Sequence, residues 1–257
     1  MNLFHAAILG LVEGLTEFLP ISSTGHLIIA AKLLGLSQTE FLKSFEIAIQ
    51  LGAILAVVVL YGRRLLIRKD IFLKVCVAFI PTAVLGAIFY KIVKKYLMSW
   101  EALVLWTLLL GGVILILFEK WHQTRESGSE DWSALSYKKA FWVGVCQSVA
   151  MVPGVSRAGA TIIGGLVMGI PRRVIVEFSF LLAVPTMLAA TALDLIKSGF
   201  VFASGEAAFL TVGFATSFIV AILVIKIFLQ FIRNHTFAVF GWYRIFAAIL
   251  LFFILQR

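Results

Sequence analysis

The fold is decided by residues 13–26, which read EGLTEFLPISSTGH. This stretch gathers two glutamates, a proline, two serines, a threonine and a histidine between apolar segments. The polar break leaves apolar pieces of only about 10–15 residues, which are too short to cross a bilayer alone. Residues 1–35 are therefore predicted to form a re-entrant helix–loop–helix hairpin, because bare backbone at membrane depth is tolerated only where it packs in protein or lines a wet cavity.

The chain as a whole is strongly apolar. Its 257 residues are 61% hydrophobic and 14% charged, with a mean hydropathy of +1.05. A soluble domain carries about a quarter charged residues, so the composition indicates an integral membrane protein surrounded by membrane lipid. The net charge of +9 is typical of basic cytoplasmic loops, and no soluble basic domain is present to bind nucleic acid.

The hydropathy pattern predicts an all-α polytopic membrane protein. A second broken apolar region, residues 138–170, resembles the first and predicts a second re-entrant hairpin. Between and after the two hairpins, six stretches are long and apolar enough to cross the bilayer. They are residues 41–61, 71–90, 101–118, 174–195, 207–229 and 236–255.

The two hairpin sequences align at a constant offset, which indicates an internal duplication. The matched positions are residues 10–13 with 144–147, 21–25 with 155–159, and Gly35 with Gly169. Each copy then holds one hairpin and three spans, and an odd number of spans turns the second copy upside down. Inverted repeats with broken helices bring their polar loops together near the bilayer midplane.

The predicted organisation is a single membrane domain, residues 1–257. Repeat one covers about residues 1–120, a cytoplasmic loop covers about 121–137, and repeat two covers about 138–257. Most loop arginines and lysines fall on one side of the six-span arrangement, and the positive-inside rule makes that side cytoplasmic. The first hairpin then enters from outside, and the site is expected near the midplane, opening to the periplasmic side.

Glu13 and Glu17 are four residues apart and share one face of the first half-helix. Carboxylates inside a membrane are costly and point to function. A pair of them suits a divalent cation, Mg²⁺ or Ca²⁺, because such ions prefer oxygen ligands. The alternative is that one glutamate pairs structurally with Arg157.

The serines and threonine of the first hairpin follow Pro20, which ends the half-helix. Ser22, Ser23 or Thr24 can cap the next helix, whose N-terminus is a ready anion site. His26 is close enough to Ser23 in sequence to act as its base or acid, and its alternative role is that of a polar group satisfied inside the hairpin.

The second hairpin offers a matching arrangement after Pro153. Ser156 and Thr161 supply hydroxyls, Gly159 lets the backbone come close, and Arg157 adds a planar cation suited to bidentate phosphate contacts. Together the two hairpins predict phosphate chemistry, and a site at membrane depth implies a lipid-tailed substrate.

Other charged residues lie in or at the ends of the spans and are given structural roles. Arg244 is expected to pair with one of the acids Glu46, Glu177 and Asp194.

The motifs EGLTEFLPISSTGHL and PGVSRAGAT resemble the two signatures of the undecaprenyl-diphosphate phosphatase family, also called the bacitracin-resistance family. The resemblance covers essentially the whole chain, including FEIAIQLGAILAVV and EFSFLLAVPTMLAATALDL. One departure is visible: Ala158 stands where the family usually has serine, so that hydroxyl is dispensable here or is replaced by water.

The resemblance implies a bacterial inner-membrane enzyme that removes the terminal phosphate of undecaprenyl diphosphate. The product is the carrier lipid used in cell-wall synthesis, and the activity confers bacitracin resistance. The first signature carries over to six residues, Glu13, Glu17, Ser22, Ser23, Thr24 and His26. The second carries over to four residues, Ser156, Arg157, Gly159 and Thr161.

The mechanistic hypothesis makes Glu13 and Glu17 hold the metal while Ser23, assisted by His26, attacks the terminal phosphorus opposite Arg157. A metal-activated water attacking directly is the rival. Glu17, Ser23, His26 and Arg157 are the catalytic set, and the other hydroxyls and Gly159 bind the diphosphate.

Two other functional classes compete with the phosphatase. A transporter or flippase of an anionic or lipid-linked substrate also uses inverted repeats and broken helices, but needs no serine beside a histidine. A phosphatidic acid phosphatase of type 2 is discounted, because no histidine follows Ser156 and Arg157 until His235. The oligomeric state stays open, with a homodimer as one alternative.

Overall fold

The computed structural model describes residues 1–37, 39–97, 100–122, 131–198 and 206–256. Within these ranges the chain is helical and forms no strand. Six helices are long and apolar enough to cross a membrane. They are α3 (Glu40–Ile67), α4 (Lys69–Ile92), α5 (Glu101–Trp121), α8 (Arg172–Ser198), α9 (Ala207–Phe231) and α10 (Ala238–Leu255).

All six predicted spans are confirmed as long apolar helices. Two of them contain an internal proline, Pro81 in α4 and Pro185 in α8. Prolines are tolerated in membrane helices because neighbouring helices and hydroxyl side chains satisfy the backbone groups that they free. The chain is therefore an all-α, multi-pass membrane protein.

The two broken regions are pairs of short helices. The first pair is α1 (Leu3–Thr16) and α2 (Ser23–Leu33), and the second is α6 (Tyr137–Ser148) and α7 (Arg157–Val167). Short helical turns complete the described chain: η1 (Val93–Leu97), η2 (Trp132–Ala134) and η3 (Val149–Met151). Each hairpin is followed by three long helices, as the duplication predicts.

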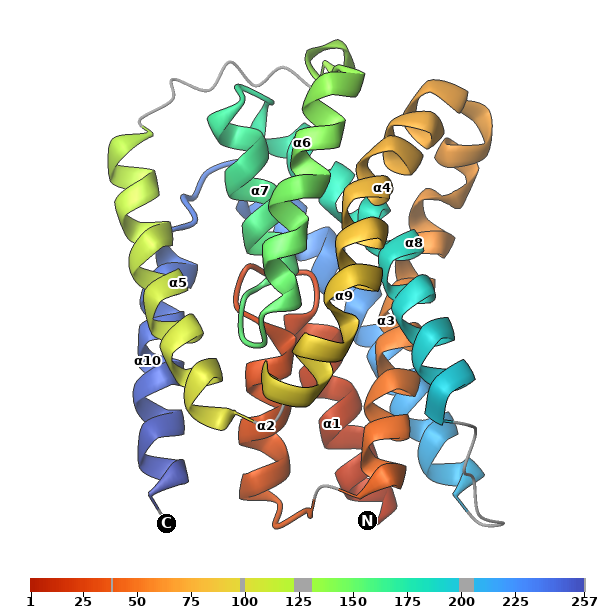
Figure 1. Cartoon of the computed structure of the whole chain (residues 1–257), viewed down its shortest axis with the longest axis vertical. Helices are drawn as coiled ribbons and strands as arrows, with labels where there is room; N and C mark the ends of the chain where they lie inside the picture. The colour runs from red at the N-terminus through yellow and green to blue at the C-terminus, as the bar shows by residue number, and fades with distance from the viewer. Residues whose placement is uncertain (38, 98–99, 123–130, 199–205, 257) are drawn as a thin grey trace.

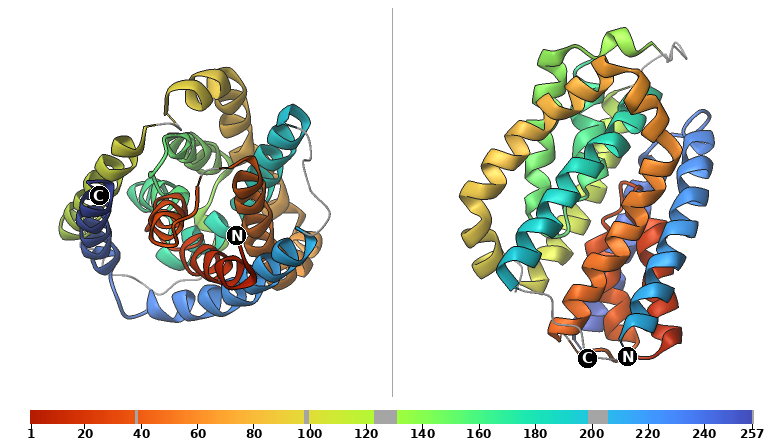
Figure 2. Two further views of the ribbon diagram at one scale, coloured as in Figure 1. Left: turned by 90° about the horizontal axis from the view of Figure 1, so that it is seen from below. Right: turned by 90° about the vertical axis from the view of Figure 1, so that its right-hand side faces the viewer.

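The hairpins approach each other inside a ring of long helices. In Figure 1 the α1–α2 pair lies toward the end that holds both termini, and the α6–α7 pair lies toward the opposite end. Seen along the long axis, the four short helices occupy the middle and the long ones surround them (Figure 2). The inverted symmetry between the halves and the repeat boundaries stay predictions, and residues 123–130 of the predicted loop lie outside the described residues.

Local sequence explains where the short helices begin. Asn2 caps α1 by accepting a hydrogen bond from the His5 amide at 2.8 Å, and Ser136 caps α6 through the Lys139 amide at 3.3 Å. Polar residues at these positions satisfy amides that have no partner inside the helix.

Close helix packing and a phenylalanine core fix the first hairpin in place. A Cβ on Gly10 of α1 would collide with the carbonyl of Gly213 in α9, so only glycine permits this crossing. Phe18 is fully buried in the loop after α1, and its ring packs edge-on against Phe180 of α8, with 5.3 Å between the ring centroids. The residues that follow α1 are therefore anchored to the long helices.

Candidate active site

The loops that interrupt the two hairpins touch each other at several points. Arg157, the first residue of α7, points its Nη2 at Oε1 of Glu17, 3.4 Å away. Ser156 donates from its hydroxyl to the main-chain carbonyl of Leu19 at 3.4 Å. Only 11% of the Arg157 side chain and 4% of the Glu17 side chain are exposed. The two hairpins thus share one buried polar centre, as the sequence predicts.

Glu17 makes hydrogen bonds to residues of both hairpins. Its second carboxylate oxygen, Oε2, accepts a short hydrogen bond of 2.6 Å from the hydroxyl of Ser23. One carboxylate therefore holds a hydroxyl from the first hairpin and faces the guanidinium from the second. This arrangement polarises the Ser23 hydroxyl toward loss of its proton.

Two helix N-termini face this centre. Ser22 caps α2 by accepting from the Gly25 amide at 3.5 Å, and Ser156 caps α7 by accepting from the Gly159 amide at 3.0 Å. Ser22 has φ 72°, a left-handed conformation that costs a non-glycine residue about 1–3 kcal/mol and often marks a functional site. The free amides and the helix dipoles favour an anion at this position.

Glu13 lies one turn before Glu17 and is fully buried. Neither of its carboxylate oxygens has a hydrogen-bond partner within the described chain, and the same is true of Nε of Arg157. A buried carboxylate without a donor is costly unless a cation compensates it. The site therefore fits a divalent ion held by Glu13 and Glu17.

The protein supplies few ligands for such an ion. The described residues contain no cluster of three or more His, Cys, Asp or Glu side chains placed to hold a metal. Mg²⁺ is commonly held in proteins by one or two carboxylates, with substrate phosphates and water completing its shell. The donor set matches an ion that binds together with a phosphate substrate.

His26 makes contacts that its sequence position did not suggest. Its Nδ1 lies 2.7 Å from the Ser22 carbonyl, and its Nε2 lies 2.9 Å from the hydroxyl of Tyr243 in α10. A carbonyl can only accept, so we infer that Nδ1 carries the proton and that Nε2 accepts from Tyr243 in the neutral ring. Within the described chain Ser23 donates to Glu17 and both His26 nitrogens have other partners, so the assistance of His26 to Ser23 stays a prediction.

The remaining predicted residues are Thr161, which contacts α8, and Gly159 and Thr24, which lie in the first turns of α7 and α2. Thr161 has its hydroxyl 2.6 Å from that of Ser179 in α8, and Nη1 of Arg157 donates to the Ser179 carbonyl at 2.8 Å. Thr161 and Arg157 thus both contact Ser179, and the direct contact of Thr161 with the diphosphate stays a prediction. Gly159 is buried beside Ser156, and Thr24 is exposed in the first turn of α2.

Arg244 has a different role from the predicted ion pair with an acid. Its guanidinium donates to four main-chain carbonyls, those of Pro20, Gly154, Thr107 and Leu108, at 3.2, 3.2, 2.7 and 3.3 Å. Pro20 and Gly154 belong to the two hairpin loops, so one side chain ties both loops to α5 and α10. Glu177, one of the acids expected to pair with Arg244, instead pairs with Arg64 at 2.5 Å and with Arg173 at 3.0 Å.

Three contributors to the site were missed or misassigned from the sequence: Ser179, Tyr243 and Arg244. Each sits inside an apolar span, where a polar side chain is itself a functional signal. The signal marks Arg244 clearly, but its partners are carbonyl groups, which every residue carries and no residue pattern reveals.

Comparison with known proteins agrees with the motifs. Residues 6–250 match the family described as "Bacitracin resistance protein BacA". A protein of Aquifex aeolicus named "Undecaprenyl-diphosphatase" is 52% identical over 245 residues, which cover 95% of each chain. One of Wolinella succinogenes with the same name is 48% identical over 256 residues, covering 100% of this chain and 99% of the relative. The chain belongs to the bacitracin resistance protein BacA family.

Proposed function

We propose that the protein is an integral membrane phosphatase that hydrolyses undecaprenyl diphosphate to undecaprenyl phosphate and inorganic phosphate. This reaction recycles the lipid carrier for cell-wall synthesis and confers bacitracin resistance. Relatives that share about half of their residues with this chain over nearly its full length carry the name "Undecaprenyl-diphosphatase". The BacA family and the membrane-spanning helices agree with this function.

The observation that carries the proposal is the position of Glu17 between Ser23 and Arg157. Phosphoryl transfer needs a nucleophile, a group that removes its proton, and positive charge around the phosphorus. The Ser23 hydroxyl, the Glu17 carboxylate and the Arg157 guanidinium can supply these three functions, and both Ser23 and Arg157 lie within hydrogen-bonding distance of the Glu17 carboxylate.

In the proposed reaction Oγ of Ser23 attacks the terminal phosphorus. Its proton passes to Glu17 as the bond between Oγ and phosphorus forms. The bond from that phosphorus to the bridging oxygen breaks, and undecaprenyl phosphate leaves with the bonding electrons. Water then attacks the phosphoserine, Glu17 returns the proton to the serine oxygen, and inorganic phosphate is released. Arg157 and the amides of α2 and α7 neutralise the charge of the phosphate group throughout.

A divalent cation, Mg²⁺ or Ca²⁺, is proposed at Glu13 and Glu17. The two carboxylates outnumber the one guanidinium of Arg157, so these side chains alone do not neutralise the charge of a diphosphate. A bound divalent ion reverses this balance and supplies charge neutralisation to the phosphate oxygens. The unpartnered oxygens of Glu13 support this assignment.

Tyr243 and His26 have a proposed role beside the reacting phosphate. With Nδ1 bound to the Ser22 carbonyl, the imidazole is fixed next to the cap of α2, and the Tyr243 hydroxyl holds Nε2. We assign this pair to holding the cap of α2 in place beside the reacting phosphate, with Ser22, Thr24, Ser156, Gly159 and Thr161 binding the diphosphate.

The proposed location is the bacterial inner membrane, with the basic end of the molecule in the cytoplasm. The α3–α4 turn and the starts of α6 and α8 all carry arginine or lysine, and these lie at the end away from the termini (Figure 1). The positive-inside rule places this end in the cytoplasm and the termini in the periplasm. We propose that the site opens to the periplasmic side, and a homodimer stays a prediction.

The testing experiment is phosphate release from undecaprenyl diphosphate by purified protein in detergent, with EDTA and then with Mg²⁺ or Ca²⁺ restored. Release that stops with EDTA, returns with metal, and is lost in Glu17→Gln supports the proposal. Glu40→Gln is the matched control, because Glu40 is an exposed carboxylate at the start of α3. No release from folded wild-type protein would favour a transporter or flippase, in which the serines serve as anion caps.

A further inference from the structure

Ser179 of α8 holds one end of the Arg157 guanidinium. Its main-chain carbonyl accepts a hydrogen bond from Nη1 of Arg157 at 2.8 Å, and its hydroxyl oxygen lies 3.4 Å from the same nitrogen. The other terminal nitrogen, Nη2, faces Oε1 of Glu17 at 3.4 Å. Because the guanidinium is a rigid planar group, a fixed Nη1 also restricts the direction of Nη2. A residue outside both hairpins therefore helps to direct Arg157 toward Glu17.

The Ser179 hydroxyl is itself fixed by Thr161 of α7. The two hydroxyl oxygens are 2.6 Å apart, and the Thr161 hydroxyl also lies 3.0 Å from the main-chain carbonyls of Arg157 and Ala158. A carbonyl only accepts, so Thr161 donates to one of these carbonyls and Ser179 donates to Thr161. The Ser179 oxygen then accepts from Nη1 of Arg157. These hydrogen bonds form a closed ring that leads from the Arg157 side chain back to the first turn of α7.

The ring is shielded from water. Ser179 and Thr161 are fully buried, and only 11% of the Arg157 side chain is exposed. Hydrogen bonds are stronger in such surroundings of low dielectric constant than they are in water. Charged groups that are already oriented when a substrate arrives need no reorganisation during the reaction. The burial of the ring therefore favours a fixed orientation of Arg157.

The neighbour of Ser179 in α8 contacts the other half of the site. Phe180 is fully buried and packs edge-on against Phe18, which directly follows Glu17. Two consecutive residues of α8 thus contact Arg157 of the second hairpin and the residue next to Glu17 in the first. Since both contact points belong to one helical turn, the helix backbone sets their separation.

We propose that Ser179 is a positioning residue for the phosphatase reaction. Ser179 orients the Arg157 guanidinium, and Phe180 anchors the loop beside Glu17, so α8 fixes how these two groups face the terminal phosphate. Ser179 does not touch the reacting atoms and acts through Arg157. This inference rests on the proposed function, because the orientation of Arg157 matters only if a phosphate group binds beside it.

The test is a double-mutant cycle on kcat/KM for phosphate release from undecaprenyl diphosphate, with enzyme in excess for the slow variants. It uses wild type, Ser179→Ala, Arg157→Gln and the double variant. Ser179→Ala is expected to lower kcat/KM about tenfold, because the charged guanidinium loses a hydrogen-bond partner. In the Arg157→Gln background the same substitution should change kcat/KM less than about twofold, because no guanidinium is left to orient. Equal losses in both backgrounds would overturn the proposal.

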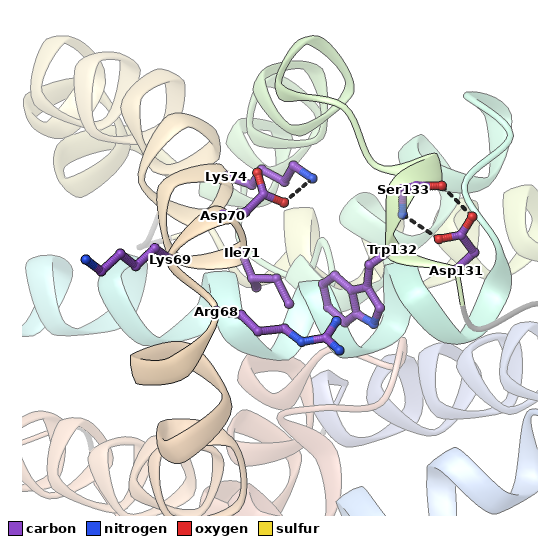
Figure 3. Close-up of a pocket in the computed structure, with 8 residues that line it drawn as sticks. All are labelled: Arg68, Lys69, Asp70, Ile71, Lys74, Asp131, Trp132 and Ser133. Atoms are coloured by element: carbon purple, nitrogen blue, oxygen red, sulfur yellow. Dashed lines mark hydrogen bonds and ion pairs between the residues drawn. The ribbon is translucent and has the colours of Figure 1, made fainter.

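Two serines serve as controls. Ser217 in α9 is fully buried, and its hydroxyl has no hydrogen-bond partner within the described chain. Ser133 binds Asp131 through its amide and its hydroxyl, in the pocket between η2 and the α3–α4 turn (Figure 3). Ser217→Ala and Ser133→Ala are expected to keep wild-type turnover. If Ser179→Ala does not fold, Ser179→Cys takes its place in the cycle, because a thiol is close in size to a hydroxyl and is a weak donor and acceptor.

A binding measurement separates this inference from the proposed function. Calorimetry follows the titration of each variant with farnesyl methylenediphosphonate, whose bridge cannot be hydrolysed. Ser179→Ala is expected to bind this analogue about tenfold more weakly than Ser217→Ala does, and equal affinities would overturn the role of Ser179. A wild type that binds the analogue but releases no phosphate would overturn the proposed hydrolysis alone, and weaker binding by Ser179→Ala would still support the positioning role. A wild type that neither binds the analogue nor releases phosphate would overturn both.

Discussion

The proposed catalytic centre depends on a contact between Ser23 and Glu17, two residues that are six positions apart in the sequence. Their 2.6 Å hydrogen bond is possible because the helix breaks between them and the chain turns back on itself. On a continuous helix, positions six apart do not share a face. In the proposed mechanism the helix break serves catalysis, because it lets the Glu17 carboxylate reach Ser23.

Replacing Ser23 by alanine removes the proposed nucleophile and leaves the cap of α2 intact, because Ser22 provides that cap. The turnover number for phosphate release is expected to fall at least about a thousandfold. Steady-state kinetics measure the loss, and an unchanged melting temperature shows that the variant is folded. Near-normal turnover would instead identify a metal-activated water as the attacking group.

Replacing Tyr243 by phenylalanine removes the hydroxyl that holds Nε2 of His26 at 2.9 Å and keeps the ring that stacks on the imidazole. Turnover is expected to fall about tenfold, because this factor corresponds to the free energy of one lost hydrogen bond in a buried site. KM is expected to change little. The pH profile of turnover should shift as well, because the histidine loses a partner. Tyr137→Phe, at the far end of the molecule, is the control, and equal effects of the two variants would refute the role of Tyr243.

The sequence reveals the side chains of the proposed catalytic centre more reliably than their hydrogen-bond partners. Glu13, Glu17, Ser23 and Arg157 stand out because polar groups are rare in such an apolar chain. The pairing of Ser23 with Glu17, and of His26 with Tyr243, depends on how the broken helices fold back and on α10, more than two hundred residues away. No local pattern contains that information.

The elements that matter most to the site are the two interrupted helices. Their breaks are predictable from Pro20 and Pro153 and from the capping serines, and the structure places helix ends close to these residues. What holds the two breaks together was not predictable, because Arg244 binds carbonyl groups of both loops. Gly154 has φ +84°, and a Cβ there would approach the backbone of Val104 within 2.9 Å, which explains why the second break carries glycine.

Replacing Arg244 by glutamine is expected to loosen both loops together. Several buried carbonyls lose their donor, and one unsatisfied buried group costs about 1–3 kcal/mol. The melting temperature in detergent and the turnover number should therefore both fall, with partial recovery of each in Arg244→Lys. Lys226→Gln, an exposed cation in α9, is the control. A variant with normal stability and normal turnover would show that Arg244 does not organise the loops.

At the scale of the whole molecule, the long helices enclose the hairpins. At the basic end a buried ion pair connects three of the segments that make up this enclosure. Arg172 binds Glu119 through two hydrogen bonds of 3.0 and 3.2 Å, and Glu119 also accepts from the Phe237 amide at 2.8 Å. This cluster ties together α5, α8 and the segment that leads into α10. The six spans were predictable from hydropathy alone, but this closure was not, since it joins positions more than a hundred residues apart.

Glu119→Gln is expected to lower the free energy of unfolding by about 3 kcal/mol, because removing one partner of a buried pair leaves the other charge uncompensated. Turnover at a temperature where the variant is folded should stay normal. Glu40→Gln disrupts only the exposed pair with Lys43, and its effect should be under about 1 kcal/mol. Chemical unfolding in detergent measures both, and equal stabilities of the two variants would contradict the structural role of Glu119.

The most direct measurement is a double-mutant cycle on kcat/KM for phosphate release from undecaprenyl diphosphate. It uses wild type, Glu17→Gln, Arg157→Gln and the double variant, with metal present. If the two hairpins form one catalytic unit, each single variant loses at least about a thousandfold, and the double variant loses no more than the worse single one. Losses that multiply in the double variant, or full activity in either single one, would contradict a site shared between the hairpins.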